Sequence, residues 1–456
     1  MKSYPAYKDS DIEWLGDIPK HWKLHRIKSA IDSSANGVWG DEAQGDDNDL
    51  ICVRVADFDM ATLGISRQNL TVRNINKGHQ NGRIFKQGDL LIEKSGGGEN
   101  QPVGRMIRFD LDPDTPSVCS NFVAKISVKE TYVSNYLLYY AYSLYSKNIN
   151  TRSIKQTTGI QNLDLESYIN ELMPVPPYSE QRVIANYLDH KTAAIDTLIA
   201  KKERQIELLQ EQRAAVINQA VTRGLNPDAP MKDSGIEWIG RIPADWVVGK
   251  LRWYCQSIRD GTHNPPARIP GIHRLLSVRN IINGRFVVRN DDRTMSPEAF
   301  EELQRSYTVE KGDIVLAIVG GTTGKSAIVE DMQNVTVQRS LAILRPNHSK
   351  LISAFLNYWL QSHYIQNVIN MIMIKYAAQP GIYLTDVSDL AILVPPRERQ
   401  EEIVAFLEQA SSNYKRVKSR LTKEIDLLQE YRTALISAAV TGKIDVRNEV
   451  QEANIA

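Results

Sequence analysis

The stretch KDSDIEWLGDIPKHW, residues 8–22, returns as KDSGIEWIGRIPADW, residues 232–246, with every identity at an offset of 224 residues. Further along, VPPYSEQRVIANYLD from Val175 is matched by VPPRERQEEIVAFLE from Val394, 219 residues later. The segment LLQEQRAAVINQAVT, which closes the first half, has the counterpart LLQEYRTALISAAVT in the second. Because the order of the segments is the same in both halves, this tandem repeat predicts two copies of one fold.

The composition indicates a folded chain without a membrane segment. Charged residues make up 24% of the 456 residues and are well mixed, which argues against wholesale disorder. No apolar run approaches the ~18 residues of a membrane span, and Met1 is followed by no signal-like stretch. Cys52, Cys119 and Cys255 offer neither a disulfide framework nor a metal cluster, and the eight histidines form no ligand pair at helical spacing. We therefore expect a cytoplasmic protein that holds no metal.

Each half begins with a mixed α/β region, roughly residues 20–175 and 244–394. Strand-like pieces alternate there with Gly- and Asn-rich turns. FKQGDLLI from Phe85 and VEKGDIVL from Val309 keep the offset of 224, so the two regions share a fold, whereas the loops between such anchors diverge. The expected strands are residues 50–55, 89–93 and 122–128 in the first half and 274–278, 313–319 and 340–344 in the second.

A long helix follows each mixed region, just after a Pro-Pro pair at 176–177 and 395–396. Each helix spans about 44 residues, or roughly 66 Å at 1.5 Å per residue. Apolar positions at a seven-residue interval indicate a coiled-coil seam in both, with Lys202 as the one polar member. The seam residues are Leu188, Ile195, Lys202, Leu209 and Val216 in the first helix and Leu407, Tyr414, Leu421, Leu428 and Leu435 in the second.

If the helices pair with each other, the second mixed region between them favours an antiparallel arrangement with one globular region at each end of a rod. A pair of core helices within a larger globule is the alternative. We expect an α/β mixed (α+β) fold, in which two similar globular domains are separated by two long antiparallel coiled-coil helices with pseudo-twofold symmetry. The expected segments are residues 1–178 and 224–396 for the globular domains, 179–223 and 397–443 for the helices, and 444–456 for a flexible tail.

The repeated motifs resemble those of one protein family. KDSxIEWxGxIPxxW, the VPP segment and LLQExR…AVT, in this order and in both halves, are similar to the specificity subunit of Type I restriction-modification systems. The resemblance covers nearly the whole chain. It implies that each mixed region is a target recognition domain for one half of an asymmetric, bipartite DNA site, and that the helices are the spacer between the half-sites. It also implies that this subunit performs no chemistry itself.

The resemblance further implies partners that carry the cofactors. Two modification subunits with S-adenosylmethionine would dock on the chain and methylate adenine in double-stranded DNA, and two restriction subunits using ATP and Mg would join them. No cofactor is expected on the chain itself. The net charge of +1 is low for a DNA-binding protein, since phosphate contacts need Lys and Arg. A coiled-coil adaptor that binds other proteins without DNA specificity is therefore the competing interpretation.

Two local patterns resemble enzyme motifs but lack a required residue. GGTTGKS from Gly320 has three residues between its first Gly and the Gly-Lys pair, where a phosphate-binding loop needs four. NPPA from Asn264 ends in Ala267, which cannot stack on a flipped-out base as the aromatic residue of a methyltransferase tetrad does. We interpret the first as a Gly-rich loop that approaches DNA phosphates or forms a plain turn, and the second as a loop.

The repeat also sorts the candidate DNA contacts. Residues that match between the halves suit shared roles such as phosphate contact, and unmatched polar loops suit base readout. Arg54 and Arg279 line up, which favours phosphate contact or structural pairing equally, and Arg105 and Lys325 line up as phosphate contacts. Arg and Lys suit guanine, and Asn and Gln suit adenine. The readout candidates, each with a solvated side chain as the alternative, are Asn100, Gln101, Arg152, Lys155 and Gln156 in the first half and Thr322, Thr323, Arg339, Lys375, Tyr376 and Gln379 in the second.

Four tryptophans belong to the repeated segments, namely Trp14, Trp22, Trp238 and Trp246. Since they are the same in both halves, they cannot distinguish two half-sites. They pack where each globular domain joins its helix, or they face a partner, because aromatic residues are favoured interface anchors. Both interpretations stay open at this point.

Overall fold

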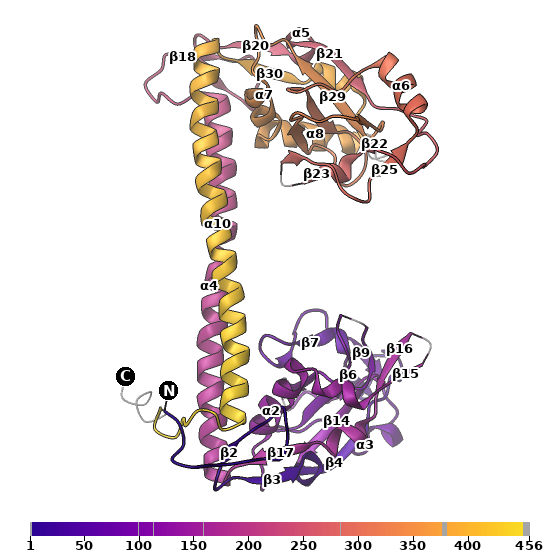
Figure 1. Ribbon diagram of the computed structural model, residues 1–456, viewed down its shortest axis with the longest axis vertical. Coiled ribbons are helices and arrows are strands. Elements are labelled where there is room, and N and C mark those ends of the chain that lie inside the picture. The colour runs from indigo at the N-terminus through magenta and orange to yellow at the C-terminus, as the bar shows by residue number, and fades with distance from the viewer. Residues whose placement is uncertain are drawn as a thin grey trace. The chain divides into compact units, whose positions relative to one another are not determined.

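The computed structural model describes residues 2–98, 100–112, 114–157, 159–282, 284–375 and 381–449. It divides into two compact units, Met1–Arg204 with Leu421–Ala456, and Gln205–Arg420 (Figure 1). Each unit contains one mixed α/β region together with part of both long helices, α4 (Tyr178–Arg223) and α10 (Arg397–Val440). Two of the readout candidates, Tyr376 and Gln379, lie outside the described residues.

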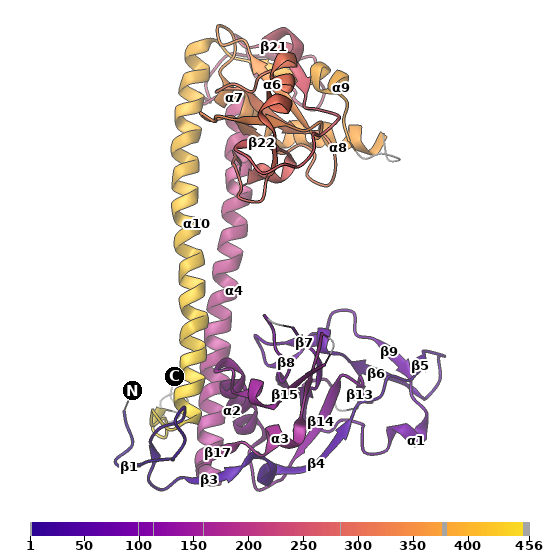
Figure 2. The same cartoon turned by 45° about the vertical axis from the view of Figure 1, so that its right-hand side comes forward.

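Three sheets form most of the first mixed region. Their strands are β4 (Ile31–Asn36), β5 (Asp41–Glu42), β6 (Asp49–Val53), β9 (Val72–Asn74), β10 (Leu90–Glu93), β11 (Ser95–Gly96), β12 (Met106–Arg108), β13 (Ser117–Cys119), β14 (Val123–Val128), β15 (Ile154–Thr157) and β16 (Ile160–Leu163). The strand orders are β12-β10-β14-β4, β13-β6-β9-β5 and β11-β16-β15 (Figure 2). β10 is antiparallel to both its neighbours, whereas β13 and β6 run parallel.

Shorter elements complete the first unit. The paired strands are β1 (Tyr7–Lys8) with β2 (Ile18–Pro19), β3 (Lys23–Arg26) with β17 (Leu172–Val175), and β7 (Phe58–Asp59) with β8 (Gly64–Ile65). The helices are α1 (Lys77–Gln80), α2 (Ser134–Ser146) and α3 (Leu165–Ile169), and the 3-10 turns are η1 (Ile27–Ala30), η2 (Val55–Asp57) and η3 (Ile149–Ser153).

The core of the first unit joins α2 to β10 and to both long helices. Tyr136, Tyr139 and Tyr140 of α2 are buried, and the Tyr136 hydroxyl lies 2.7 Å from Pro174 O. The side chain of Trp22 is fully buried, and its Nε1 donates a hydrogen bond of 3.0 Å to Glu180 of α4. Buried aromatic side chains of this size contribute a large share of a core's apolar area. They attach the mixed region firmly to the helix that follows it.

The second unit repeats this plan with a larger sheet. Its strands are β18 (Met231–Asp233), β19 (Arg241–Pro243), β20 (Val247–Lys250), β21 (Cys255–Asp260), β22 (His273–Leu276), β23 (Ile281–Ile282), β24 (Arg285–Phe286), β25 (Arg293–Met295), β26 (Ile314–Ala317), β27 (Ser326–Ile328), β28 (Val335–Val337), β29 (Leu341–Pro346) and β30 (Ala391–Val394). The main sheets have the orders β21-β29-β26-β27-β24-β23 and β25-β22-β28, and β18-β19 and β20-β30 form pairs.

Helices cover the sheets of the second unit. They are α5 (Leu251–Tyr254), α6 (Pro297–Ser306), α7 (Ser353–Leu360), α8 (His363–Lys375) and α9 (Leu384–Asp389), with the 3-10 turn η4 (Val278–Asn280). Trp246, Phe355 and Trp359 are buried in the core that α7 shares with β26, β29 and the long helices. Trp246 therefore occupies the same kind of position as Trp22 in the first unit.

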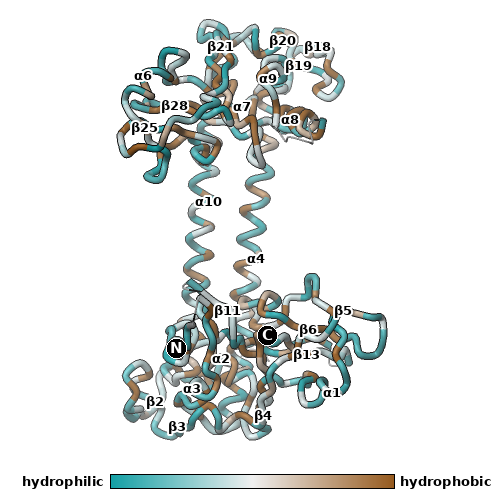
Figure 3. The backbone as a smooth tube through the Cα atoms, turned by 90° about the vertical axis from the view of Figure 1, so that its right-hand side faces the viewer, coloured by the Kyte–Doolittle hydropathy of each residue, from teal (hydrophilic) through white to brown (hydrophobic). Residues whose placement is uncertain are grey.

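α4 and α10 pack against each other in both units, antiparallel to one another (Figures 1 and 2). In the first unit, Asp196 pairs with Arg432 at 2.9 Å and Lys202 pairs with Glu424 at 2.5 Å, so residue numbers rise along α4 as they fall along α10. In the second unit, the Arg213 guanidinium lies 5.7 Å from the centre of the Tyr414 ring. Figure 3 shows both helices as largely hydrophilic, with hydrophobic residues recurring along them. The predicted mixed α/β fold with two similar regions and two long paired helices is confirmed.

The seam residues lie along these helix contacts. Leu188, Ile195, Leu407, Leu421 and Leu435 are buried. Leu209, Val216, Tyr414 and Leu428 are half-buried. Lys202 was expected to extend its ammonium group into water, but that group pairs with Glu424 of α10 instead. An ion pair at this position satisfies the one polar member of the seam.

Candidate nucleic-acid interface

The two Gly-rich loops join equivalent strands in the two units. Residues 94–105 connect β10 to β12, and residues 318–325 connect β26 to β27. Glu93 N donates to Arg105 O and Ala317 N donates to Lys325 O, both at 2.8 Å, so Arg105 and Lys325 occupy equivalent positions. A strand follows Lys325, whereas a nucleotide-binding phosphate loop opens a helix. The loop is therefore a connection between strands rather than a nucleotide site.

The two matched cations have different surroundings. The Arg105 guanidinium donates to both carboxylate oxygens of Glu93, at 2.8 and 3.0 Å, and the Glu93 side chain is fully buried. These hydrogen bonds raise the pKa of Arg105. In the second unit Ala317 stands where Glu93 is, and the exposed Lys325 has no ion pair among the described residues. Arg105 thus has a structural partner, and Lys325 remains the candidate for phosphate contact.

The alignment of Arg54 with Arg279 was wrong. Arg54 N donates to the Asp57 side chain at 2.7 Å, and Ser277 N donates to the Asn280 side chain at 2.9 Å, so Arg54 corresponds to Ser277. These side-chain caps start η2 and η4, which is also why the strands end at Val53 and Leu276, earlier than expected. A shared Val-Arg dipeptide produced the false match.

Both arginines are nevertheless paired with carboxylates. The Arg54 side chain donates to the two Asp57 oxygens at 2.7 and 3.1 Å. Arg279 donates to Asp291 at 2.9 Å and to the fully buried Asp292 at 2.8 Å. Of the two roles left open for these residues, the geometry favours structural pairing.

The remaining first-half candidates lie on exposed loops and one hairpin. Asn100 and Gln101 are exposed in the Gly-rich loop. Arg152 is exposed at η3, and Lys155 and Gln156 are exposed on β15. Lys155 pairs with Asp164 at 2.7 Å, but this contact is at the surface and is worth little in water. The structure thus leaves all five side chains accessible.

The second-half candidates are more scattered. Thr322 and Thr323 are half-buried in the Gly-rich loop, where the Thr323 hydroxyl donates to Gly320 O at 2.7 Å. Arg339 is exposed in the turn between β28 and β29. Lys375 is exposed at the end of α8.

Sequence matching missed three residues in the first unit. Trp39, Asn121 and Phe122 are exposed around a hollow of about 450 Å³. Asn121 and Phe122 lie in the turn between β13 and β14, which is the structural equivalent of the turn that holds Arg339. The offset there is 218 residues and no side chain is identical, so the sequence alone gave no signal.

Enzyme-like side chains are used structurally. Glu93 pairs with Arg105, and Asp89 pairs with Lys125 at 3.2 Å. Burial raises the pKa of the Cys52 thiol to about 11 and those of Cys119 and Cys255 to about 12, so none is a ready nucleophile at neutral pH. Among the described residues no cluster of His, Cys, Asp and Glu fits a metal ion. Nor does any helix in this part of the chain combine the length and apolar character needed to cross a bilayer.

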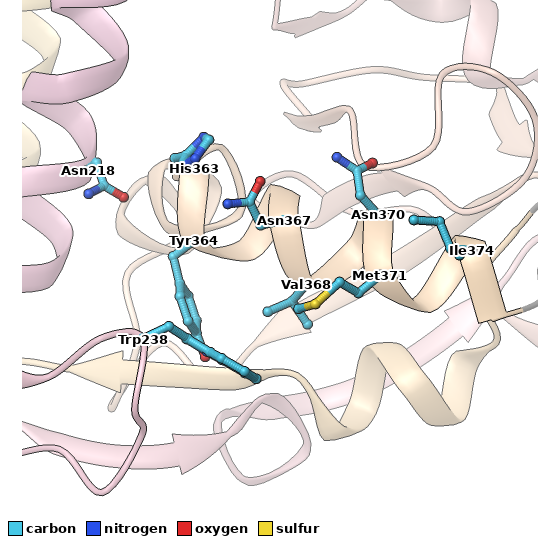
Figure 4. A pocket seen from close by; sticks show the side chains of 9 residues that line it. All are labelled: Asn218, Trp238, His363, Tyr364, Asn367, Val368, Asn370, Met371 and Ile374. Carbon is cyan, nitrogen blue, oxygen red and sulfur yellow. The ribbon is translucent and has the colours of Figure 1, made fainter.

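The repeated tryptophans divide into two kinds. Trp22 and Trp246 are buried and pack in the cores. Trp14 is half-buried, with its ring 6.3 Å from that of Tyr140. Trp238 is 63% exposed and lies beside Tyr364, next to a cavity of about 450 Å³ that Asn218 of α4 and Met371 of α8 also line (Figure 4). Packing thus accounts for one pair, whereas Trp238 presents a surface to a partner.

Comparison with known proteins gives one consistent result. The family model for the Type I restriction modification DNA specificity domain matches residues 55–208 and 281–426. The EcoBI specificity subunit of Escherichia coli is 29% identical over 72% of this chain and 70% of its own length. The MjaVIII specificity subunit of Methanocaldococcus jannaschii is 27% identical over 73% of this chain and 75% of its own length.

Two solved structures share the fold. One, described as showing complex assembly and conformational transition of the type I R-M system, has a TM-score of 0.68 at 17% identity and covers 94% of this chain and 99% of that chain. The HsdS subunit from Thermoanaerobacter tengcongensis has a TM-score of 0.51 at 18% identity, covering 94% and 98%. Since the family model matches both mixed regions and most of both long helices, this chain belongs to the Type I restriction-modification specificity family and is the non-catalytic DNA specificity subunit of such a system.

Proposed function

We propose that each mixed region is a target recognition domain that reads one half of an asymmetric, bipartite site in double-stranded DNA. The observation that carries this proposal is a shared backbone framework with different side chains, as at Arg105 and Lys325. A common framework serves docking on the duplex, and divergent side chains serve two different half-sequences. The domains would be residues 1–178 and 224–396.

The long helices, residues 179–223 and 397–443, would set the distance between the half-sites and receive two modification subunits. Exposed apolar side chains on both helices support this role, since apolar residues on a hydrophilic helix are natural anchors for a partner. They are Leu198 and Leu427 in the first unit and Leu208 and Val417 in the second. S-adenosylmethionine would be bound by the modification subunits, and ATP and Mg by two restriction subunits.

The test is methylome sequencing of a host that expresses this chain with its modification subunit, compared with a host that lacks this chain. A new methylated adenine motif in two parts, with an unspecified gap, is expected. If no motif forms, although the same modification subunit is active with another specificity subunit, the proposal is wrong. Membership of the specificity family already disfavours an adaptor without DNA specificity.

A further inference from the structure

Two three-residue turns occupy equivalent places in the two units. Residues 120–122 join β13 to β14, and residues 338–340 join β28 to β29. We refer to them as the first and second turn. Four backbone hydrogen bonds recur around them: Ser120 N to Val53 O and Gln338 N to Leu276 O; Gly37 N to Val123 O and Gly261 N to Leu341 O; Val38 N to Cys119 O and Thr262 N to Val337 O; and Lys94 N to Phe122 O and Ile318 N to Ser340 O. The backbone of both turns is therefore fixed in the same way.

A glycine closes each framework from the opposite strand. A Cβ on Gly37 would lie 2.0 Å from Ser120 O, and a Cβ on Gly261 would lie 2.1 Å from Val337 O. No side chain fits at either position without moving the backbone. The turns are thus held rigidly from below, which leaves their own side chains free to differ without a cost to the fold.

The side chains of the first turn border an open, mostly apolar hollow. Phe122 is 47% exposed and Trp39, which faces the same hollow, is 40% exposed. Asn121 is exposed between them in the chain, and Ser120 is buried at the lining of the hollow. The Ser120 hydroxyl has no hydrogen-bond partner among the described residues. An unpaired buried hydroxyl costs stability unless a ligand or water completes it.

The second turn presents a cation instead. Arg339 is exposed and has no ion pair in the described part of the chain, in contrast to Arg54, Arg105 and Arg279. The neighbouring Ser340 hydroxyl is also buried without a partner there. An unpaired guanidinium on a rigid turn keeps its planar donor fork available to an external acceptor.

We propose that these two turns read bases, one in each half-site. Arg339 donates to O6 and N7 of a guanine, which is the pairing that a free guanidinium makes in the major groove. Asn121 pairs with N6 and N7 of an adenine, and Phe122 contacts a neighbouring thymine methyl group. This inference rests on the proposed function and adds to it the residues that specify the sequence.

The test uses the full chain with its modification subunit, and the methylated fraction of every adenine site in the host genome is measured by single-molecule sequencing. R339A should relax one guanine position in one half-site, with discrimination there falling roughly 10- to 100-fold. N121A should relax one adenine position in the other half-site and leave the first unchanged. Each variant is thus the control for the other. R339Q, which keeps a bidentate side chain, should shift the same position from guanine towards adenine.

The outcomes separate this inference from the proposed function. If the wild-type chain gives a bipartite motif and the variants keep it, or lower methylation evenly at all sites, the turns do not read bases although the proposed function stands. If the wild-type chain gives no motif, both fail. Thermal melting of each variant identifies misfolding, and a relaxed position in a variant with unchanged melting supports the inference.

Discussion

Arg105 and Lys325 stand at one position of the repeat, yet their substitution should have opposite effects. R105A leaves the fully buried Glu93 carboxylate without its partner, which should lower the free energy of unfolding by about 3–5 kcal/mol. K325A removes an exposed cation, so stability should change by less than about 0.5 kcal/mol. If Lys325 contacts a phosphate, K325A should weaken DNA binding evenly across sequences and reduce the slope of log K against log salt by about 1.

Chemical denaturation and DNA binding at several salt concentrations measure both effects. The double variant E93A/R105K copies the chemistry of the second unit, where Ala317 and Lys325 occupy these positions. It should be more stable than R105A, because no buried charge is left unpaired. Equal losses for R105A and K325A would contradict the assignment of different roles.

At this scale the sequence could predict which residue types face each other across the repeat but not their partners. The match of Arg105 with Lys325 was correct because a constant offset runs through the neighbouring strand. Arg54 and Arg279 were mismatched because one dipeptide coincided, although the capping side chains Asp57 and Asn280 fix a different register. Asn121 and Phe122 could not be found, since only the hydrogen bonds of the backbone relate them to Arg339 and its neighbour.

At the scale of elements, one buried glutamine starts each long helix. Gln181 donates to Pro176 O at 3.0 Å and accepts from Val133 N at 3.0 Å. Gln400 donates to Pro395 O at 2.9 Å and accepts from Ile352 N at 2.9 Å. These bonds tie the first turn of the helix to the start of α2 or α7. The repeated Gln in VPPxxxQ was a signal that the sequence carried.

Substitution of either glutamine should therefore loosen one helix start. We expect Q181A and Q400A each to cost about 1–3 kcal/mol for every buried group left unpaired. Because the two sites lie in different units and share no partner, the losses should add in the double variant. Hydrogen exchange at Val133 N and Ile352 N measures them separately. Faster exchange at both amides in a single variant would contradict this independence.

The helices themselves should set the gap between half-sites. Their pairing is antiparallel, so seven residues must be added to both, between Lys202 and Arg213 and between Tyr414 and Glu424, to keep the seam in register. The added heptad lengthens each helix by about 10.5 Å, which corresponds to about three base pairs at 3.4 Å each. We expect the methylated motif to gain about three unspecified base pairs with both half-sequences unchanged.

The control is an insertion of four residues into α4 alone, which shifts the seam against α10 and should lower stability rather than change the gap. An unchanged gap in a stable paired variant would contradict the spacer role. The heptads made this element the most predictable part of the fold. What they could not reveal is that Lys202 finds Glu424 on the other helix, because pairing depends on register across two distant segments.

For the whole molecule, the two recognition regions should be interchangeable modules. The repeat gives the boundaries, since residues 20–175 correspond to 244–394. A chimera that carries a second copy of residues 244–394 in place of 20–175 should replace the first half-sequence of its motif by the second. The second half-sequence should stay as it is. A change in both half-sequences would show that the regions do not read DNA independently.

The joints decide whether this chimera folds. Trp22 donates to Glu180 of α4, whereas the transplanted Trp246 would meet the same Glu180 from an equivalent buried position. Across α10, the Tyr136 hydroxyl lies 3.1 Å from Val440 O and Ser143 donates to Ser437 at 3.1 Å. The transplanted region lacks these groups, so the chimera should melt at a lower temperature than the parent chain. Restoring that loss by grafting the α2 residues, with no further change in the motif, would separate the residues that join the module to its helices from those that read DNA.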